Sequence, residues 1–290
     1  MTMTKKMGII GYPLGHTLSP TIQQAGLNEA GIDATFEAWP TPPAELKGKV
    51  EQFRDEYFLG ACVTLPHKQD VIELVDDVHK DADELGAVNW ILNQNGRLFG
   101  HNTDAPGFLR ALMEELSFDP NGASALVLGA GGAARAVAFA LRSAGVSHLT
   151  IANRTQARAE KLASDFNVLD TASCGRLRIS SIEMTKDALA DVAPYADLIV
   201  NTTSVGMAGG PFPDKSPLSA DLISTDTVVY DAVYSPVETP LMKETIQAGA
   251  RGSSGLSMLV YQGVLGFELC TGVEAPASVM MKAAVDATSG

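Results

Sequence analysis

The sequence predicts an α/β protein with room for two domains of ordinary size. Short apolar runs alternate along the chain with segments rich in helix formers, which is typical of strands and helices in succession. The 290 residues, 46% of them hydrophobic, suffice for two compact cores. The third observation is a glycine-rich turn near the middle of the chain, placed between an apolar run and a helical segment.

The glycine-rich turn follows Ala125 to Leu128, a run short enough to be a buried strand. Gly129 allows a tight turn, Gly131 lets the backbone approach a pyrophosphate, and Ala134 lets helix and strand pack closely. The helix expected from Ala133 to Ala144 would point free N–H groups at the phosphates. An ordinary glycine-rich turn is the alternative, but the order of strand, glycines and helix favours a dinucleotide site over Gly129, Ala130, Gly131, Gly132 and Ala133.

The residues after the next expected strand, His148 to Ala152, favour NADP over NAD. An NAD site places an acidic residue here for the ribose hydroxyls, whereas this chain has Asn153, Arg154 and Thr155. Arg154, with Arg158 one helical turn further on, can pair with a 2′-phosphate. The alternative is that both arginines belong to the solvated start of a helix that Thr155 caps.

Charge and cysteine content limit the partners. The formal net charge of −13 argues against nucleic acid or an anionic membrane as the main partner, because both require a basic surface. No apolar run is long enough for a bilayer, and the N-terminus lacks the apolar segment of a signal peptide. Cys62, Cys174 and Cys270 are far apart without metal-like spacing, so we expect reduced thiols, no metal and a cytoplasmic location.

The first strand, expected over Met7 to Gly11, leads into a loop rich in glycine and proline. Such a loop at the carboxyl end of a strand is where α/β proteins place their sites. Thr17 and Ser19 offer two hydroxyls suited to a polyhydroxylated or carboxylated ligand, although both could be turn and cap residues. A helix should run from Pro20 to about Ala30.

Lys68 is a candidate functional residue because it breaks a local rule. We expect strand, helix and strand over Thr35 to Trp39, Leu46 to Glu56 and Leu59 to Leu65. Pro66 ends the last strand, and Lys68 is expected at the start of a helix that includes Val71 and Leu74. A lysine there opposes the helix dipole, which suggests a function; a plain surface residue is the equal alternative.

Asp104 is the second candidate. The expected strand Gly86 to Leu92 carries Asn89 and turns at Asn95-Gly96 into a returning strand. Asp104 then precedes a helix expected over Pro106 to Leu116. The competing interpretation is that Thr103 or Asp104 is only the cap of this helix.

The C-terminal half continues the alternation and ends in a strongly apolar helix. Strands, a helix and a flexible hinge are expected over Asp197 to Asn201, Thr227 to Asp231, Thr239 to Ala248 and Gly252 to Gly255. The last helix, Leu256 to Cys270, carries Gln262 among apolar residues. A buried glutamine needs partners, so Gln262 either faces a ligand or bonds the backbone.

Taken together, these segments resemble the shikimate and quinate dehydrogenase family. The resemblance covers nearly the whole chain. It rests on residues 11–20, 63–68, 86–89, 102–104, 129–133, 153–155, 201–207, Tyr234 with 239–241, and 255–272. It implies two α/β domains with the site in an interdomain cleft. Residues 1–106 and 255–290 would form the substrate-binding and catalytic domain, completed by C-terminal helices, and residues 107–254 a Rossmann-type NADP-binding domain.

The resemblance also implies an activity and residue roles. The activity is the NADP-dependent, reversible reduction of 3-dehydroshikimate to shikimate in the chorismate pathway to aromatic amino acids. Lys68 and Asp104 take the position of the catalytic pair, and the residues leave open which of them moves the proton. The implied substrate shell adds Thr17, Ser19, Thr64, Asn89, Tyr234 and Gln262 to this pair. Ala232 and Gly255 fall at the nicotinamide end of the cofactor.

Four departures from the family pattern ring the expected substrate pocket. Thr17 replaces a usual serine, Cys62 a usual asparagine, Trp90 a usual threonine, and His67 a usual apolar residue. A thiol forms much weaker hydrogen bonds than an amide. Together, these changes imply a retuned recognition of the ring acid. The same chemistry on quinate or another cyclitol carboxylate therefore stays open, as does a non-catalytic NADP-binding sensor. A homodimer also remains open.

Overall fold

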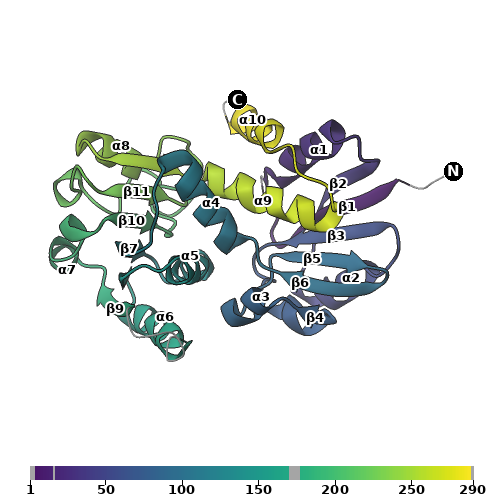
Figure 1. The fold of residues 1–290 in the computed structure, drawn as a ribbon, viewed down its shortest axis with the longest axis horizontal. Coiled ribbons are helices and arrows are strands. Elements are labelled where there is room, and N and C mark those ends of the chain that lie inside the picture. Colours follow the sequence, from purple (N-terminus) through teal and green to yellow (C-terminus); the bar gives the residue numbers. More distant parts are fainter. Residues whose placement is uncertain (1–3, 16, 170–176, 289–290) are drawn as a thin grey trace. The chain divides into compact units, whose positions relative to one another are not determined.

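The computed structural model describes residues 4–15, 17–169 and 177–288 and divides into two compact units. Unit 1 comprises Met1–Gly107 and Leu259–Gly290, and unit 2 comprises Phe108–Met258 (Figure 1). The unit boundaries fall inside α4 (Asp104–Leu116) and α9 (Leu256–Thr271). Cys174 lies outside the described residues. Within the described ranges, no helix combines the length and the apolar character needed to cross a membrane.

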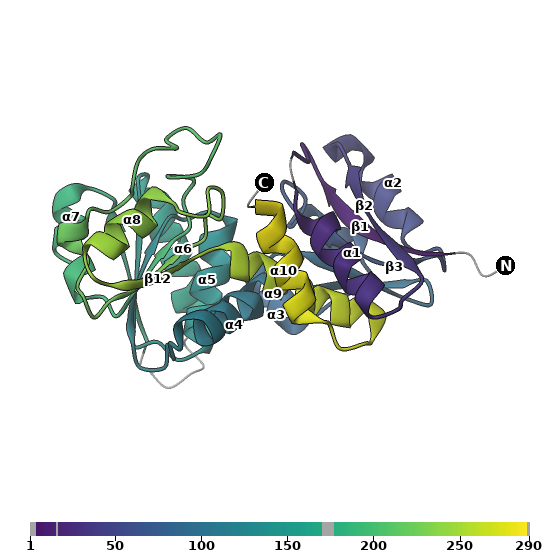
Figure 2. The same ribbon diagram turned by 90° about the horizontal axis from the view of Figure 1, so that it is seen from above.

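Unit 1 is built on a six-stranded mixed sheet of order β2-β1-β3-β5-β6-β4. β1 lies parallel to β2 and β3, and β5 runs antiparallel to β3 and β6. Helices α1 and α10 lie side by side in both views (Figures 1 and 2). The elements other than α4 and α9 are β1 (Lys5–Gly11), α1 (Ser19–Glu29), β2 (Ala34–Pro40), η1 (Pro43–Glu45), α2 (Leu46–Gln52), β3 (Phe58–Val63), η2 (Asp70–Leu74), β4 (Asp77–Val78), α3 (Lys80–Leu85), β5 (Trp90–Gln94), β6 (Arg97–His101) and α10 (Ala277–Thr288).

Two expectations about unit 1 are wrong. Lys68 does not begin a helix, because the helical turn that follows it is the short η2, which Gln69 precedes as the cap residue. The strand expected from Gly86 begins instead at Trp90. Gly86 has a left-handed backbone (φ 68°) that ends α3, a helix the sequence analysis did not predict. Glycine is favoured at this position because a Cβ disfavours positive φ.

Unit 2 is a fully parallel six-stranded sheet of order β12-β11-β10-β7-β8-β9. From the other edge the strands run third, second, first, fourth, fifth, sixth, which is the strand order of doubly wound dinucleotide-binding folds. This confirms the α/β fold class. The elements are β7 (Ser124–Leu128), α5 (Gly132–Ser143), β8 (His148–Asn153), α6 (Gln156–Leu169), β9 (Arg178–Glu183), α7 (Lys186–Ala190), η4 (Ala193–Tyr195), β10 (Leu198–Asn201), η5 (Ala220–Leu222), β11 (Val228–Asp231), α8 (Pro240–Gln247) and β12 (Arg251–Ser254).

The flexible hinge expected at Gly252 to Gly255 is wrong for most of its length. Residues up to Ser254 form β12, the edge strand that pairs in parallel with β11. A Cβ at Gly252 would lie 2.9 Å from the Val229 carbonyl oxygen, so this glycine serves close packing of the strand. Gly255 itself lies in unit 2, where its amide donates to the Val233 carbonyl at 3.1 Å.

Candidate active site

The backbone of Lys68 is fixed at the carboxyl end of β3. The strand ends at Val63, and the Val88 amide donates to the Lys68 carbonyl at 2.7 Å. The Val63 amide in turn donates to the Asn89 carbonyl at 2.7 Å. Lys68 and Asn89 therefore sit on neighbouring chain segments that backbone hydrogen bonds hold together, although 21 positions separate them in the sequence.

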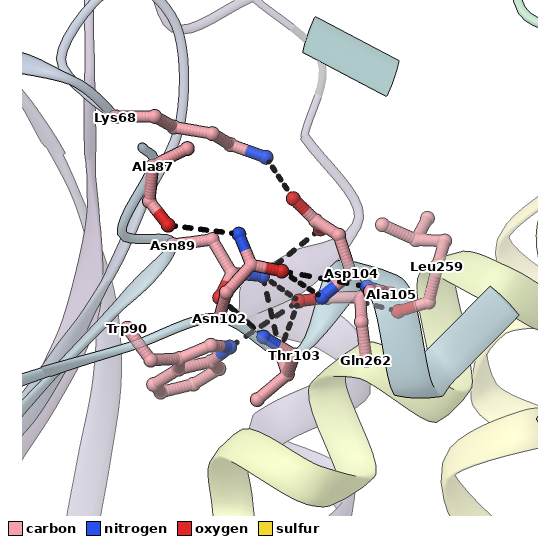
Figure 3. A network of polar contacts seen from close by, with 10 residues as sticks. All are labelled: Lys68, Ala87, Asn89, Trp90, Asn102, Thr103, Asp104, Ala105, Leu259 and Gln262. Atoms are coloured by element: carbon pink, nitrogen blue, oxygen red, sulfur yellow. Dashed lines mark hydrogen bonds and ion pairs between the residues drawn. The ribbon is translucent and has the colours of Figure 1, made fainter. Parts of the chain in front are cut away.

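Asp104 is the first residue of α4, and another side chain caps this helix. The Asn102 side-chain oxygen accepts from the amides of Asp104 (3.0 Å) and Ala105 (3.4 Å). Both Asp104 carboxylate oxygens are thus available, and they accept from Lys68 Nζ at 2.6 Å and from Asn89 Nδ2 at 2.9 Å (Figure 3). The interpretation of Asp104 as a helix cap is therefore wrong.

Two opposing effects, burial and the neighbouring Asp104, act on the pKa of Lys68. Burial acts to lower the pKa of Lys68, but the charge of Asp104 and its hydrogen bond raise it, and the net pKa lies above the ordinary value. At neutral pH the lysine is therefore an ammonium group. The two side chains are 28% and 15% exposed, so a ligand can reach them.

Behind this pair lies a buried network of polar side chains. Asn89 Nδ2 also donates to Thr103 Oγ1 at 3.0 Å, and its oxygen accepts from the Thr103 amide at 2.7 Å. Gln262 Oε1 accepts from Trp90 Nε1 at 3.2 Å and from Asn89 Nδ2 at 3.4 Å (Figure 3). These bonds join β5, the start of α4 and α9. They hold Asn89, and through it Asp104, in one orientation.

The hydroxyls of the first loop lie at the same end of the sheet as β3's carboxyl end. Tyr12 donates its amide to the Leu65 carbonyl at 3.0 Å, which ties the loop to the segment that carries Thr64. Thr17 Oγ1 accepts from the Ser19 amide at 3.3 Å and lies 3.3 Å from Ser19 Oγ. The pair therefore forms a local turn, as the alternative interpretation expected, and this does not exclude a ligand.

Three other expected site residues form a second group, in unit 2. Ala232 and Tyr234 follow β11, and a Cβ at Gly255 would overlap the Ala232 carbonyl. Tyr234 is half-buried, and burial raises the pKa of its hydroxyl. The loop after β11 and the segment just before α9 thus approach each other closely at Ala232 and Gly255.

The glycine loop after β7 divides into a packed and an open part. Gly129 has φ +111°, and a Cβ there would lie 2.5 Å from Thr202 Oγ1. In contrast, a Cβ at Gly131 or Gly132 would meet no heavy atom within 4 Å. Within unit 2 as described, α5 begins without a side-chain cap or an acidic residue in its first turn. The open loop and these free amides fit a pyrophosphate.

The two arginines expected at the 2′-phosphate are exposed. Asn153 ends β8, and its side chain donates to the Thr155 carbonyl at 2.9 Å; Thr155 then stands immediately before α6. Among residues 4–15, 17–169 and 177–288, neither Arg154 nor Arg158 forms a salt bridge. Their guanidinium groups are therefore available to an anion.

Sequence reasoning missed one member of the site network. Thr103, which is buried, was considered only as a cap, yet it donates and accepts in the Asn89 network and lies 3.4 Å from Gln262 Oε1. The signal was its place between Asn102 and Asp104, where three consecutive polar residues follow a strand.

Three segments match family descriptions. Residues 9–91 match "Shikimate dehydrogenase substrate binding domain", residues 112–204 "Shikimate / quinate 5-dehydrogenase", and residues 255–285 "Shikimate 5'-dehydrogenase C-terminal domain". The shikimate dehydrogenase (NADP(+)) of Methanopyrus kandleri is 44% identical over 98% of this chain and 96% of the relative. The chain belongs to the shikimate dehydrogenase family.

Solved structures of the shikimate dehydrogenase family agree with this fold. Shikimate 5-dehydrogenase from Thermus thermophilus, solved in complex with NADP(H) and shikimate, is 39% identical with a TM-score of 0.85, covering 98% of this chain and 99% of that one. Quinate dehydrogenase from Corynebacterium glutamicum, solved with NAD, is 31% identical with a TM-score of 0.88, covering 98% and 99%. Both substrate alternatives thus have a relative of the same fold.

Three of the four departures from the family pattern, Cys62, His67 and Trp90, are buried, and Thr17 is partly buried. Burial raises the pKa of the Cys62 thiol to about 12, so Cys62 is a neutral thiol near the Lys68–Asp104 pair. Cys62 stands directly opposite Trp90 across β3 and β5. His67 is also buried and makes a hydrogen bond through Nε2 with the Thr41 carbonyl at 2.7 Å.

Proposed function

We propose that this chain is an NADP-dependent shikimate dehydrogenase that reversibly reduces 3-dehydroshikimate to shikimate. The observation that carries the proposal is the 2.6 Å contact between Lys68 Nζ and Asp104 Oδ2, partly open to solvent and backed by a buried amide network. This arrangement, in a chain 44% identical to a shikimate dehydrogenase (NADP(+)), supplies a proton donor beside a substrate site. The reaction belongs to chorismate and aromatic amino acid biosynthesis.

Lys68 is the proton donor in the direction of reduction. NADPH, when bound, supplies a hydride to the carbonyl carbon, and the carbonyl oxygen then gains negative charge. The Lys68 ammonium donates its proton to that oxygen, while Asp104 orients the ammonium and compensates its charge. In the reverse direction Lys68 must first lose a proton, which its raised pKa disfavours at neutral pH.

The remaining substrate shell is polar and suits a hydroxylated ring acid. The hydroxyls of Thr17, Ser19, Thr64 and Tyr234 and the amides of Asn89 and Gln262 are assigned to the ring hydroxyls and the carboxylate. Hydroxyls and amides both donate and accept, which suits a ligand with several such groups. Apart from Tyr234, the residues assigned to the substrate lie in residues 1–106 and 255–290.

Residues 107–254 are assigned to NADP. The pyrophosphate would lie against Gly129, Ala130, Gly131, Gly132 and Ala133, where backbone amides and open space support an anion. Arg154 and Arg158, with Asn153 and Thr155 beside them, would bind the 2′-phosphate, because a guanidinium fork matches phosphate geometry. Ala232 and Gly255 would face the nicotinamide end.

Quinate is the second candidate substrate. The observation that favours keeping it is the pair of departures Cys62 and Trp90, which face each other across two strands beside the catalytic pair. A site that lacks one hydrogen-bonding amide discriminates less between ring acids that differ in a hydroxyl.

A four-way activity comparison tests the proposal. The purified protein is assayed with shikimate or quinate and with NADP+ or NAD+ in each combination. We expect the highest kcat/KM with shikimate and NADP+. A higher value with quinate would transfer the assignment to the second candidate. Binding of NADPH without turnover of either acid would indicate a sensor and overturn the enzymatic proposal.

A further inference from the structure

Trp90 makes a specific polar contact inside unit 1 although it is a large and mostly apolar residue. Its indole is 1% exposed, and Nε1 donates to Gln262 Oε1 at 3.2 Å across 172 positions of sequence (Figure 3). The indole fills space that a side chain at position 266 of α9 would otherwise occupy. A Cβ at Gly266, one turn further along α9, would overlap the indole. The glycine in the middle of a helix is thus explained by the tryptophan that fills its place.

The indole N–H determines which way the Gln262 amide faces. An indole N–H only donates, so it bonds the amide oxygen and not the amide nitrogen. Asn89 Nδ2 and Thr103 Oγ1 also lie within 3.4 Å of the same oxygen. The amide nitrogen donates one N–H to the Leu259 carbonyl at 2.9 Å. Among residues 4–15, 17–169 and 177–288, the other N–H of Gln262 has no acceptor, so it is a donor that a ligand can use.

The backbone of Gln262 is fixed as well. A Cβ at Gly107 would lie 2.7 Å from the Gln262 nitrogen and 2.9 Å from its Cα. Gly107 is in the first turns of α4, the helix that begins with Asp104. The absence of a side chain at Gly107 therefore lets α9 approach the start of α4, which brings Gln262 to the same polar network as the catalytic pair.

We propose that Trp90 is a positioning residue that holds Gln262 with one N–H directed to a substrate acceptor oxygen, a hydroxyl or a carboxylate. The inference rests on the proposed function, because it concerns how that site recognises a ring acid. Trp90 lies behind Gln262, makes no step of the reaction and acts only through the amide.

The test compares the two tryptophans of the chain. Trp90→Phe removes the indole N–H and keeps an aromatic ring, and Trp39→Phe is the matched control, because Trp39 Nε1 donates to Glu37 at 2.9 Å away from the network. For Trp90→Phe we expect KM for shikimate to rise about three- to tenfold, the effect of one hydrogen bond. We expect kcat and KM for NADP+ within about twofold of wild type. Trp39→Phe should leave all three unchanged.

Two outcomes of this comparison overturn the inference: an unchanged KM for shikimate in Trp90→Phe, or an equal rise in both KM values, which indicates a general structural role. A separate variant tests whether Gln262 acts as a hydrogen-bond donor to the substrate. Gln262→Glu keeps an oxygen for Trp90 but removes the N–H, so KM for shikimate should rise at least as much as in Trp90→Phe. Shikimate binding as tight as in wild type would contradict the donor assignment.

A spectroscopic measurement needs no change at Trp90. In Trp39→Phe, Trp90 is the sole tryptophan, so its emission reports on the Gln262 contact. Saturating shikimate should change that emission, because a ligand bound to the amide alters the field at the indole. Unchanged emission, while calorimetry shows shikimate bound, would overturn the inference. Absence of wild-type turnover with shikimate would instead count against the proposed function, so the two failures are distinct.

Discussion

Each unit contains a carboxylate held by a network of hydrogen bonds, and the two networks differ in their donors and in their exposure to solvent. In unit 1, Asp104 accepts from Asn89 and from the partly exposed ammonium of Lys68. In unit 2, Asp231 is fully buried and accepts from Asn201 Nδ2 at 2.8 Å, the Val233 amide at 3.1 Å and Thr239 Oγ1 at 2.6 Å. Neutral internal groups are thus the donors to Asp231, while a cation that solvent can reach is a donor to Asp104.

The difference distinguishes a chemical role from a structural one. Burial raises the pKa of the Asp231 carboxyl and outweighs the hydrogen bonds from Thr239, Val233 and Asn201, which lower it. Its donors connect the ends of β10 and β11 with the N-cap residue of α8, which fixes three segments. The Asp104 network instead leaves one charged group available. A buried carboxylate is therefore no evidence of a catalytic site by itself, and the proposed catalytic role of Asp104 depends on the partly exposed ammonium of Lys68 beside it.

The largest expected effect is on turnover when the open cation is removed. Lys68→Ala should lower kcat by about 10²- to 10⁴-fold, the usual contribution of a positioned general acid, with a modest change in substrate affinity. Lys49→Ala is the matched control, because this lysine of the same unit lies over the Trp39 ring at 4.3 Å. Steady-state kinetics measure both. Turnover of Lys68→Ala near wild type would remove the basis of the comparison.

The second effect is on stability and concerns the closed network. Asp231→Ala leaves the side chains of Asn201 and Thr239 and the Val233 amide without their acceptor. The free energy of unfolding should fall by about 2–4 kcal/mol, because buried donors lose their partners. Urea denaturation followed by circular dichroism measures it, with Asp226→Ala on the exposed surface as control. An unfolding free energy equal to wild type, together with lost activity, would reverse the roles of the two networks.

The sequence predicts local features of these networks better than their connections. The glycine loop at Gly129 and the strand before it were predicted correctly, because strand, turn and helix follow one another within a few residues. Lys68 was singled out for a helix start that does not exist. Its contact with Asp104 spans 36 positions, and no local pattern encodes such a distance. The family resemblance, and not periodicity, paired them.

The hinge shows the opposite error. Gly252 to Gly255 has the composition of a flexible segment, but an edge strand accepts glycine where a neighbouring backbone comes close. The partners of Gln262 were equally hidden, because Trp90 lies 172 positions away. The sequence could state that a buried glutamine needs partners and could not choose them.

A third, smaller effect tests whether the exposed Arg154 of unit 2 binds the 2′-phosphate of NADP+. Arg154→Ala should raise KM for NADP+ by about 10- to 100-fold, the range of a charged hydrogen bond, and leave KM for NAD+ unchanged. NAD+ serves as the internal control, because it lacks the 2′-phosphate. This result would assign the binding of the 2′-phosphate to the exposed arginine that follows β8, whereas the buried Asp231 would keep a structural role. An equal loss with both cofactors would indicate a structural role for Arg154.

The smallest expected effect is a displacement of a pH profile, and it tests the coupling inside the unit 1 pair. Shikimate oxidation needs neutral Lys68, so its rate should rise with pH through a pKa above the ordinary 10.5. In Asp104→Asn the carboxylate no longer raises that pKa, while burial still lowers it. The rising limb should therefore move to lower pH, even though the maximal rate falls.

The raised pKa of Lys68 also determines how the stability of the folded chain changes with pH. The raised pKa means that the Lys68–Asp104 contact stabilises the folded chain below the unfolded lysine's pKa, and the contribution disappears as pH rises through the folded value. Asp104→Asn should then flatten the loss of thermal stability above the ordinary lysine pKa of 10.5 as well as shift the kinetic limb. A rising limb that stays in place in Asp104→Asn would show that another group titrates in the reaction, and Lys68 would lose its role as the base.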